Sequence, residues 1–387
     1  MKVLLVHNEY GKRSGEEAVV DRMDAMLRGM GHAVARLTRS SAGARESLAG
    51  RVRAFVDGVH CPKGVKAMRE ALLREKPDVV NVHNLYPFIS PAALRECRKA
   101  GVPVVMTVHN YRLLCPTGLF MRGGGPCELC LERGNEWGCV RYNCERSLPK
   151  SVAYAARNAV ARIRRHYIDC VDVFACLTEF QRDKLIKGGY TPEKIVVIPN
   201  TVETGGKVPT GVGGAYVGYV GRLSREKGID LIIEAARRNG HIPFKLAGSV
   251  ADESLVADLP ANMEYVGFKS GEELEDFFDN AKFMVMASRW YEGFPMSILE
   301  AGARRKCVIA PDHGGFSEIV SQKGHGAPIG RLFAPGDAVS LAAAVSELWD
   351  NQPEAERLGR AAFNAVCARY SSEAVAEMWQ RLLLEII

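Results

Sequence analysis

The chain has 387 residues and is 47% hydrophobic, which is long and apolar enough for two hydrophobic cores rather than one. Its formal net charge of +6 is a mild basic bias that argues against a nucleic-acid-binding protein and suits one that handles phosphates or an anionic membrane surface. No run approaches the ~18 apolar residues that a membrane span needs, and His7 and Asn8 come too early for a signal peptide, so we expect a cytoplasmic protein.

The first half alternates short apolar runs with helical stretches, a pattern typical of a parallel sheet covered by helices. Helices are expected at residues 15–30 and 91–100, where apolar residues recur at spacings of three and four. Strands are expected at KVLLVHN (2–8), HAVARLT (32–38), DVVNVHN (78–84), VPVVMTVHN (102–110) and VDVFACLT (171–178).

A second series follows the polar, Gly-rich segment 202–214, which we interpret as a linker. Helices are expected after Gly228, Ser270, Pro295 and Asp337, and the final segment is helical with one apolar face. Strands are expected at AYVGYVG (215–221), FKLAGS (244–249), NMEYVG (262–267), KFMVMAS (282–288) and CVIAPD (307–312).

These patterns predict an α/β protein with two doubly wound, Rossmann-like domains. The domains are expected at 1–201 and 202–370, and the helix at 371–387 is expected to pack back toward the N-terminal domain. Ligands of such sheets bind beyond the carboxyl ends of the strands, so we expect functional residues just after strands, in a cleft between two facing domains.

The segment EGFPMSILEA contains Glu292 and Glu300, a glycine turn and a helix start, with Pro295 suited to the first helical turn. Backbone N–H groups around Gly293 and Phe294, together with the helix dipole, favour a phosphate or hydroxyl group there. An ordinary solvated helix start is the alternative.

The segment VGRLSREKGID places Arg222 and Lys227 between a strand end and a helix expected to open at about Ile229. Two cations near a helix N-terminus oppose its dipole unless an anion joins them, and a diphosphate can be gripped by an Arg fork and a Lys point charge. A solvated basic loop is the alternative.

These two motifs, together with further segments, make most of the chain resemble the retaining glycosyltransferases of family four, which have the GT-B fold. The resemblance rests on segments in the family's order and spacing: GRLSREKG, EGFPMSILE, VGFKSGEEL, GGFSEIV and LFAPGDAVSLAAAVSEL. It implies a hexosyltransferase that moves a sugar from a nucleoside-diphosphate sugar to a glycan or lipid-linked acceptor in cell-envelope or extracellular polysaccharide synthesis.

The resemblance also implies residue roles. Arg222 and Lys227 would hold the donor diphosphate, Glu300 the ribose hydroxyls, Glu292 the transferred sugar, and the backbone around Phe268 the base. Such enzymes need no catalytic metal, and the departing phosphate accepts the acceptor's proton. Catalysis is then mainly electrostatic stabilisation of the leaving phosphate and an oxocarbenium-like sugar.

In the N-terminal half the resemblance is looser. The loop containing Gly15 is expected over the diphosphate, although the family often has two adjacent glycines where this chain has Ser14 and Gly15. His109 matches a family position that contacts the donor sugar, and His83 is an acceptor-site candidate. A structural role is the alternative for both histidines.

Five of the eleven cysteines crowd into an insertion at about 115–147. The closely spaced pairs Cys127–Cys130 and Cys139–Cys144 suit a tetrahedral structural zinc site, with Cys115 as a fifth, competing ligand. Reduced free thiols and an iron–sulfur cluster are the alternatives.

Two further expectations concern partners and chemistry. The segment 151–168 combines a helical apolar pattern with Arg157, Arg162, Arg164, Arg165 and His166, which suggests a peripheral contact with the inner face of the membrane, with a core-facing helix as the alternative.

A nucleotide-sugar epimerase or hydrolase of the same architecture is the competing function, but it needs a pair of acid/base carboxylates that the sequence does not identify.

Overall fold

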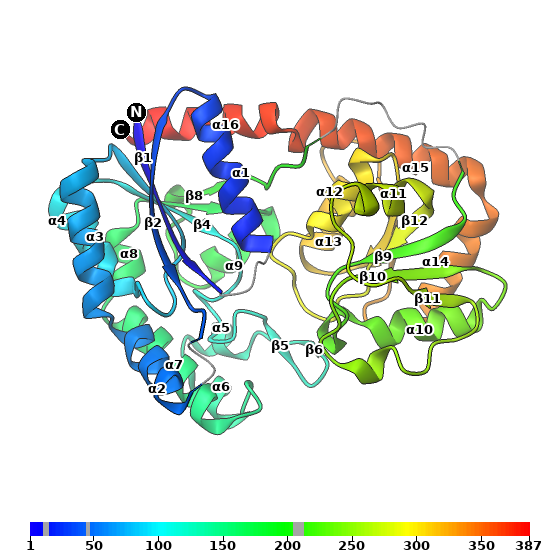
Figure 1. Cartoon of the computed structure of the whole chain (residues 1–387), viewed down its shortest axis with the longest axis horizontal. Coiled ribbons are helices and arrows are strands. Elements are labelled where there is room, and N and C mark those ends of the chain that lie inside the picture. Colours follow the sequence, from blue (N-terminus) through cyan, green and yellow to red (C-terminus); the bar gives the residue numbers. More distant parts are fainter. Residues whose placement is uncertain (11–14, 44–46, 204–212) are drawn as a thin grey trace. The chain divides into compact units, whose positions relative to one another are not determined.

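The computed structural model describes residues 1–10, 15–43, 47–203 and 213–387 (Figure 1). The chain divides into two compact units. Unit 1 comprises Met1–Phe120, Glu128–Pro199 and Val375–Ile387, and unit 2 comprises Met121–Cys127 and Asn200–Ala374. Most of the expected linker falls at 204–212, outside the described residues.

Unit 1 is built on a six-stranded parallel sheet with the order β2-β1-β3-β4-β7-β8. The order reverses between β1 and β3, which makes their carboxyl ends the switch point where ligands of such sheets bind. The strands are β1 (Lys2–Glu9), β2 (Ala33–Ser40), β3 (Val79–Asn84), β4 (Val104–Val108), β7 (Val173–Cys176) and β8 (Ile195–Val197).

Successive side chains of a strand point to opposite faces of the sheet, so alternate residues belong to two different hydrophobic cores. Leu4 and Val6 lie in a core with helices α3 (Pro62–Glu75) and α4 (Leu94–Ala100). Val3 and Leu5 lie in the other, with α1 (Gly15–Gly29) and the C-terminal part of α16 (Ser372–Ile386). The remaining helices are α2 (Leu48–Val59), α5 (Leu129–Arg133), α6 (Trp137–Arg141), α7 (Leu148–Ile163), α8 (His166–Cys170) and α9 (Glu179–Lys187).

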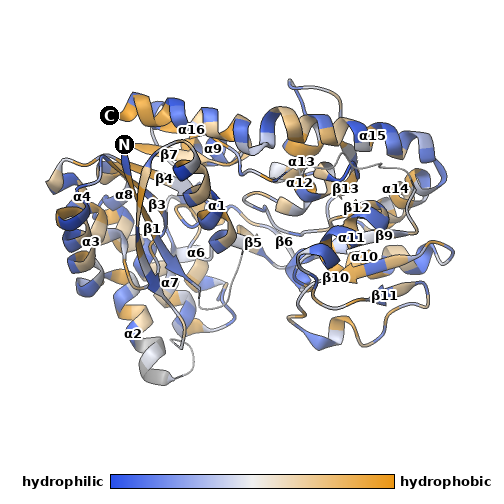
Figure 2. Cartoon of the chain, turned by 45° about the horizontal axis from the view of Figure 1, so that its top comes forward, coloured by the Kyte–Doolittle hydropathy of each residue, from blue (hydrophilic) through white to orange (hydrophobic). Residues whose placement is uncertain are grey.

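Unit 2 has a second six-stranded parallel sheet, with the order β11-β10-β9-β12-β13-β14 and its switch point between β9 and β12. Figure 2 shows hydrophobic residues both on its strands and on the helices that surround them. The strands are β9 (Tyr216–Val220), β10 (Phe244–Ala247), β11 (Met263–Tyr265), β12 (Ala281–Val285), β13 (Val308–Pro311) and β14 (Gly330–Phe333), and β5 (Met121–Arg122) and β6 (Gly125–Pro126) form a separate hairpin.

The unit 2 sheet is covered on both faces. On one face, α10 (Ile229–Arg238) and α14 (Ala338–Asp350) pack against Val217, Phe244 and Leu246. The other core includes residues of α11 (Glu272–Asn280), α12 (Met296–Ala303), α13 (Gly314–Ser321) and α15 (Gln352–Ala365).

All ten predicted strands are present, and the doubly wound α/β prediction is confirmed. The prediction missed β8 and β14, the outermost strands on one side of each sheet: β8 is only three residues long, and β14 begins with a glycine and an exposed arginine, which interrupt its apolar pattern. Pro295 is the N-cap of α12 and not part of its first turn, so that detail was wrong. Among the described residues, no helix is both long and apolar enough to span a bilayer.

Helix α16 fastens the end of the chain to unit 1 through Trp379, which is 2% exposed in the core with Val3 and Leu5. We expect Trp379→Ala to lower the free energy of unfolding by about 3–5 kcal/mol, because it leaves a cavity. Leu384→Ala, on the same helix but 65% exposed, is the control and should change it by less than about 0.5 kcal/mol. Urea unfolding followed by circular dichroism measures both, and equal midpoints would contradict this packing.

Candidate active site

The loops after β9 and β12 meet at the switch point of the unit 2 sheet, and Gly228 controls how closely they approach. Its φ is +69°, and a Cβ there would lie 2.0 Å from the carbonyl oxygen of Ala287. The backbone N–H of Arg289 also donates to the carbonyl of Glu226 at 2.9 Å. The two loops therefore pack backbone to backbone, and only glycine fits at 228.

The predicted residues Lys227 and Glu292 are in direct contact. Lys227 Nζ lies 2.7 Å from Glu292 Oε1 and 5.6 Å from the centre of the Trp290 ring. Ser288 Oγ donates to the same carboxylate oxygen. The side chains of Lys227 and Glu292 are 22% and 12% exposed, so this cation and carboxylate sit in a partly water-excluded site where electrostatic effects are strong.

Arg222 follows Gly221 at the end of β9 and pairs with Glu226 on its own loop. Its side chain is 56% exposed, so the pair contributes little to stability and the guanidinium can exchange partners readily. Sequence reasoning missed Glu226 and Ser288, although both lie inside or beside the predicted motifs.

Four helices that follow strands of this sheet begin without a side-chain cap, α11 after β11 among them, with Gly271 as its N-cap. In the other three, Gly228, Pro295 and His313 are the N-caps of α10, α12 and α13, and none caps its helix through its side chain. By contrast, Asp337 caps α14 with its carboxylate. Because α10 and α12 follow β9 and β12, uncapped N–H groups and positive dipole ends lie on both sides of the switch point, an arrangement that favours an anion.

The other residues predicted to bind the donor differ in burial and in contacts. Glu300 is half-buried on α12, and Gly293 is buried just before that helix. Phe294 packs against Tyr370, with ring centres 6.0 Å apart. Phe268 follows β11 and is 69% exposed, which leaves its ring face available for stacking.

In unit 1, three histidines stand at or beside the carboxyl ends of neighbouring strands: His7 on β1, His83 on β3 and His109 after β4. His83 Nδ1 and His109 Nε2 are 2.8 Å apart, and their rings stack with centres 5.1 Å apart. His7 meets His83 edge to face at 6.4 Å. The structure thus brings the two predicted histidines together and adds His7, whose position at a strand end was the available sequence signal.

Burial lowers the pKa of His7, His83 and His109, because it disfavours the charged imidazole. The carboxylate of Glu16 opposes this effect on the pKa of both His7 and His109. Glu16 accepts a hydrogen bond from Asn110 Nδ2 at 3.0 Å. At neutral pH this cluster therefore offers uncharged hydrogen-bonding groups.

Gly15 is the first residue of α1 and is exposed, and no described atom outside its neighbours lies within 4 Å of the position a Cβ would occupy.

A cavity of about 30 Å³, enough for about one water molecule, lies beside His83 and His109. Arg112 also lines it and donates from Nη1 to Asn84 Oδ1 at 3.2 Å.

The four predicted zinc ligands form no disulfide. Cys139 is buried on α6, and a hydrogen bond with Cys144 is the main cause of its raised pKa, to which Cys115 and Cys130 also contribute. Cys127 belongs to unit 2 and the other three to unit 1. Within the described ranges, no three His, Cys, Asp or Glu side chains are grouped so that they could hold a metal ion.

Two parallel α/β units, one with cations and uncapped helices at its switch point, define a two-domain protein of the doubly wound class. Residues 13–205 match the family model described as Glycosyltransferase Family 4, and residues 195–365 match the model described as Glycosyl transferases group 1. The chain therefore belongs to the glycosyltransferases of the family 4 type, and it is an enzyme with the GT-B fold.

Individual relatives are distant. An uncharacterized 42.6 kDa protein in the cps region of Klebsiella pneumoniae is 26% identical over 66% of this chain and 63% of that protein, less than two thirds of its length. The α-D-kanosaminyltransferase of Streptomyces kanamyceticus is 25% identical over 78% of this chain and 74% of its own.

Solved structures resemble the whole chain. Anabaena Alr3699/HepE in complex with UDP has a TM-score of 0.67 at 16% identity, with all of both chains covered. Sucrose-phosphate synthase from Thermosynechococcus elongatus has a TM-score of 0.72 at 17% identity, over 99% of this chain and 98% of that one. At such identities the likeness establishes the fold.

The buried histidines predict a pH dependence of stability. Because their pKa values are lowered on folding, the unfolded chain binds more protons, so the free energy of unfolding should fall as pH drops below about 6.5, by about 1.4 kcal/mol per pH unit for each imidazole that stays neutral. Urea midpoints between pH 7 and pH 5.5 test this. His83→Gln should flatten the slope and His325→Gln, at an exposed position, should not; identical slopes would contradict the assignment.

Proposed function

We propose that this enzyme moves a sugar, with retention of anomeric configuration, from a nucleoside-diphosphate sugar to a glycan or lipid-linked acceptor. The observation that carries the proposal is the Lys227–Glu292 contact between the N-termini of α10 and α12. A cation and the N–H groups of two helix N-termini suit the diphosphate, and the adjacent carboxylate suits hydroxyl groups of the sugar attached to it.

When the donor binds, its diphosphate would replace a carboxylate partner of Arg222 or Lys227. The diphosphate can replace Glu226 at the half-exposed Arg222 with little loss, since such a surface pair is weak. Lys227 is more buried, so its charge acts more strongly on the phosphate. The ribose is assigned to Glu300 and the rest of the nucleotide to Phe268, Gly293, Phe294 and Gly15.

In the reaction, the bond between the sugar C1 and the diphosphate oxygen breaks while the acceptor oxygen bonds to C1 on the same face. The acceptor's proton passes to an oxygen of the departing diphosphate. Arg222 and Lys227 stabilise the charge that grows on that group. Glu292 contacts the sugar, and His109, being neutral, offers it a hydrogen bond and no charge.

Relatives support the proposed substrate classes. The Anabaena structure contains UDP, which supports a nucleoside diphosphate as the donor carrier. Other relatives are an amylovoran biosynthesis glycosyltransferase of Erwinia amylovora and a lipopolysaccharide core mannosyltransferase of Rhizobium meliloti, which supports a role in cell-envelope or extracellular polysaccharide synthesis. We assign the enzyme to the cytoplasm, in peripheral contact with the inner face of the membrane.

Replacing Arg222 or Lys227 by Ala should lower kcat by about 100-fold or more, because each removes a charge that stabilises the leaving diphosphate. Arg225→Ala is the matched control: Arg225 lies in the same loop, is 69% exposed and faces Asp252. It should retain near-normal turnover. Product formation from a panel of nucleotide sugars measures all three, and near-normal turnover of both Arg222→Ala and Lys227→Ala would refute the assignment.

We also propose that the cysteine-rich insertion folds around one structural zinc ion. Cys130, Cys139 and Cys144 lie in one unit, with Cys139 hydrogen-bonded to Cys144 and Cys115 near enough to affect its pKa. Four thiolates would close the coordination sphere and leave no position for water, which is the mark of a structural metal. Cys127 and Cys115 are the two candidates for the fourth ligand.

Elemental analysis of protein purified without chelator should find about one zinc per chain. Cys139→Ser should lower that content, whereas Cys367→Ser, at an exposed position in unit 2, should not. Comparing Cys115→Ser with Cys127→Ser identifies the fourth ligand. Metal-free wild-type protein with an ordered insertion would exclude the zinc.

A further inference from the structure

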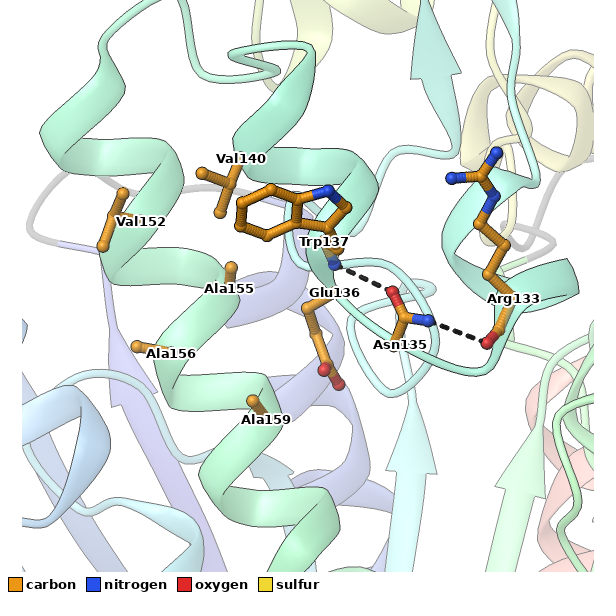
Figure 3. Close-up of a pocket in the computed structure, with 9 residues that line it drawn as sticks. All are labelled: Arg133, Asn135, Glu136, Trp137, Val140, Val152, Ala155, Ala156 and Ala159. Atoms are coloured by element: carbon orange, nitrogen blue, oxygen red, sulfur yellow. Dashed lines mark hydrogen bonds between the residues drawn. The ribbon is translucent and has the colours of Figure 1, made fainter.

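Helices α6 and α7 of unit 1 form an apolar groove of about 460 Å³ on the protein surface. Trp137 and Val140 of α6 lie beside Val152 and Ala155 of α7 (Figure 3). Ala156 and Ala159 continue the groove along α7, and its remaining lining residues are Arg133, Asn135 and Glu136.

The groove belongs to a wider apolar surface. Five of the thirteen large hydrophobic side chains exposed in the described chain lie within residues 137–163. They are Trp137 (61% exposed), Tyr142 (42%), Leu148 (56%), Val152 (42%) and Ile163 (69%). Single exposed hydrophobics are normal, but a contiguous set marks an interaction surface. We call these five residues, with the groove, the α6–α7 surface.

Helical spacing explains how α7 presents this surface. Leu148, Val152, Ala159 and Ile163 fall within one stripe of the helix, since their separations of four, seven and four residues are close to whole turns. Arg157 lies on the opposite side and is buried, with its guanidinium 3.9 Å from the centre of the Tyr154 ring. Helix α7 therefore has an inner face in the core and an outer apolar stripe.

The surroundings of this stripe are strongly basic. Residues 133–165 contain eight arginines and lysines and two glutamates, so this segment alone carries a formal charge equal to the +6 of the whole chain. One of the glutamates, Glu136, is bound by Arg162 at 2.9 Å. The exposed cations are Arg133, Arg141, Arg146, Lys150, Arg162, Arg164 and Arg165.

The structure also changes the basic face expected from the sequence. Arg157 and His166 are buried, and Arg162 and Arg165 pair with Glu136 and Asp169. The exposed basic residues of the turns and helix ends around α6, including Arg141 and Lys150, take their place.

We propose that the α6–α7 surface docks on an anionic lipid bilayer, with Trp137 and the apolar stripe entering the headgroup boundary and the surrounding arginines and lysines contacting lipid phosphates. An exposed tryptophan beside aliphatic side chains and cations is the composition that such interfaces favour. A second copy of the chain fits poorly, because two surfaces of the same positive charge repel. The inference deepens the membrane contact proposed above and does not depend on sugar transfer.

Flotation with vesicles of phosphatidylcholine, alone or mixed with phosphatidylglycerol, tests the proposal without donor or acceptor. Wild type should float with the anionic vesicles at low salt and much less with neutral ones. Trp137→Glu and the double variant Arg141→Glu/Lys150→Glu should lose binding, with about a fivefold effect expected per removed charge. Leu73→Glu, on α3 and 70% exposed in wild type, is the matched control and should float normally.

Fluorescence supplies a second measurement that does not depend on a disruptive variant. Trp137 is highly exposed, Trp290 and Trp349 are half-buried and Trp379 is buried. Anionic vesicles should therefore shift wild-type emission to the blue, and the shift should vanish in Trp137→Phe, which keeps an apolar ring and should still float.

Three results would overturn the proposal: no flotation of wild type on anionic vesicles, unchanged flotation of Trp137→Glu and the double variant, or a wild-type dimer in ultracentrifugation that Trp137→Glu dissociates. The last would assign the surface to a second copy of the chain. A chain that floats but does not transfer sugar would contradict the proposed function and leave this inference intact.

Discussion

Close backbone contact at the switch point of unit 2 is the constraint on which the proposed donor site depends. Besides Gly228, a Cβ on Gly248 would lie 1.8 Å from the carbonyl oxygen of Gly221. The loops after β9, β10 and β12 are thus joined without intervening side chains. Since α10 starts directly from Gly228, this contact also fixes where its N–H groups point. Any side chain at these glycines would separate the loops and disperse the charges that they bring together.

The two switch points carry different chemistry on similar sheets. The unit 2 switch point holds ion pairs, whereas the unit 1 switch point holds imidazoles that burial keeps neutral. Charge suits the phosphates of a donor, and neutral donors and acceptors of hydrogen bonds suit hydroxyl groups. The same topology therefore presents charged groups in one unit and neutral groups in the other, through the residues placed after its strands, and the two proposed kinds of ligand rest on this difference.

The sequence predicted those features of the fold and of the candidate site that depend on a local pattern of residues. Buried strands appear as apolar runs, and the positions of Lys227 and Glu292 in their loops follow from the motifs. Their direct contact does not, because it joins residues 65 apart and needs the adjacency of β9 and β12. The burial of Arg157 was equally unpredictable, since it requires the ring of Tyr86, in the loop after β3, and the carbonyl oxygen of Pro116, both distant in sequence. Long-range pairing, and not propensity, decided both outcomes.

The cysteine-rich insertion contains helix α6, which is held in place by contacts with its neighbours. At five residues, α6 is too short to be stable by itself and depends on tertiary contacts. Gly138 permits the closest of these, because a Cβ there would lie 3.1 Å from Leu129 Cδ2 and 3.3 Å from Cys130 Sγ. Cys139, the next residue, is buried and directs its thiol toward the Ser151 carbonyl of α7 at 3.7 Å. Residues Gly138 and Cys139 thus pack α6 against α5 and α7, and in this position Trp137 is exposed beside the apolar stripe.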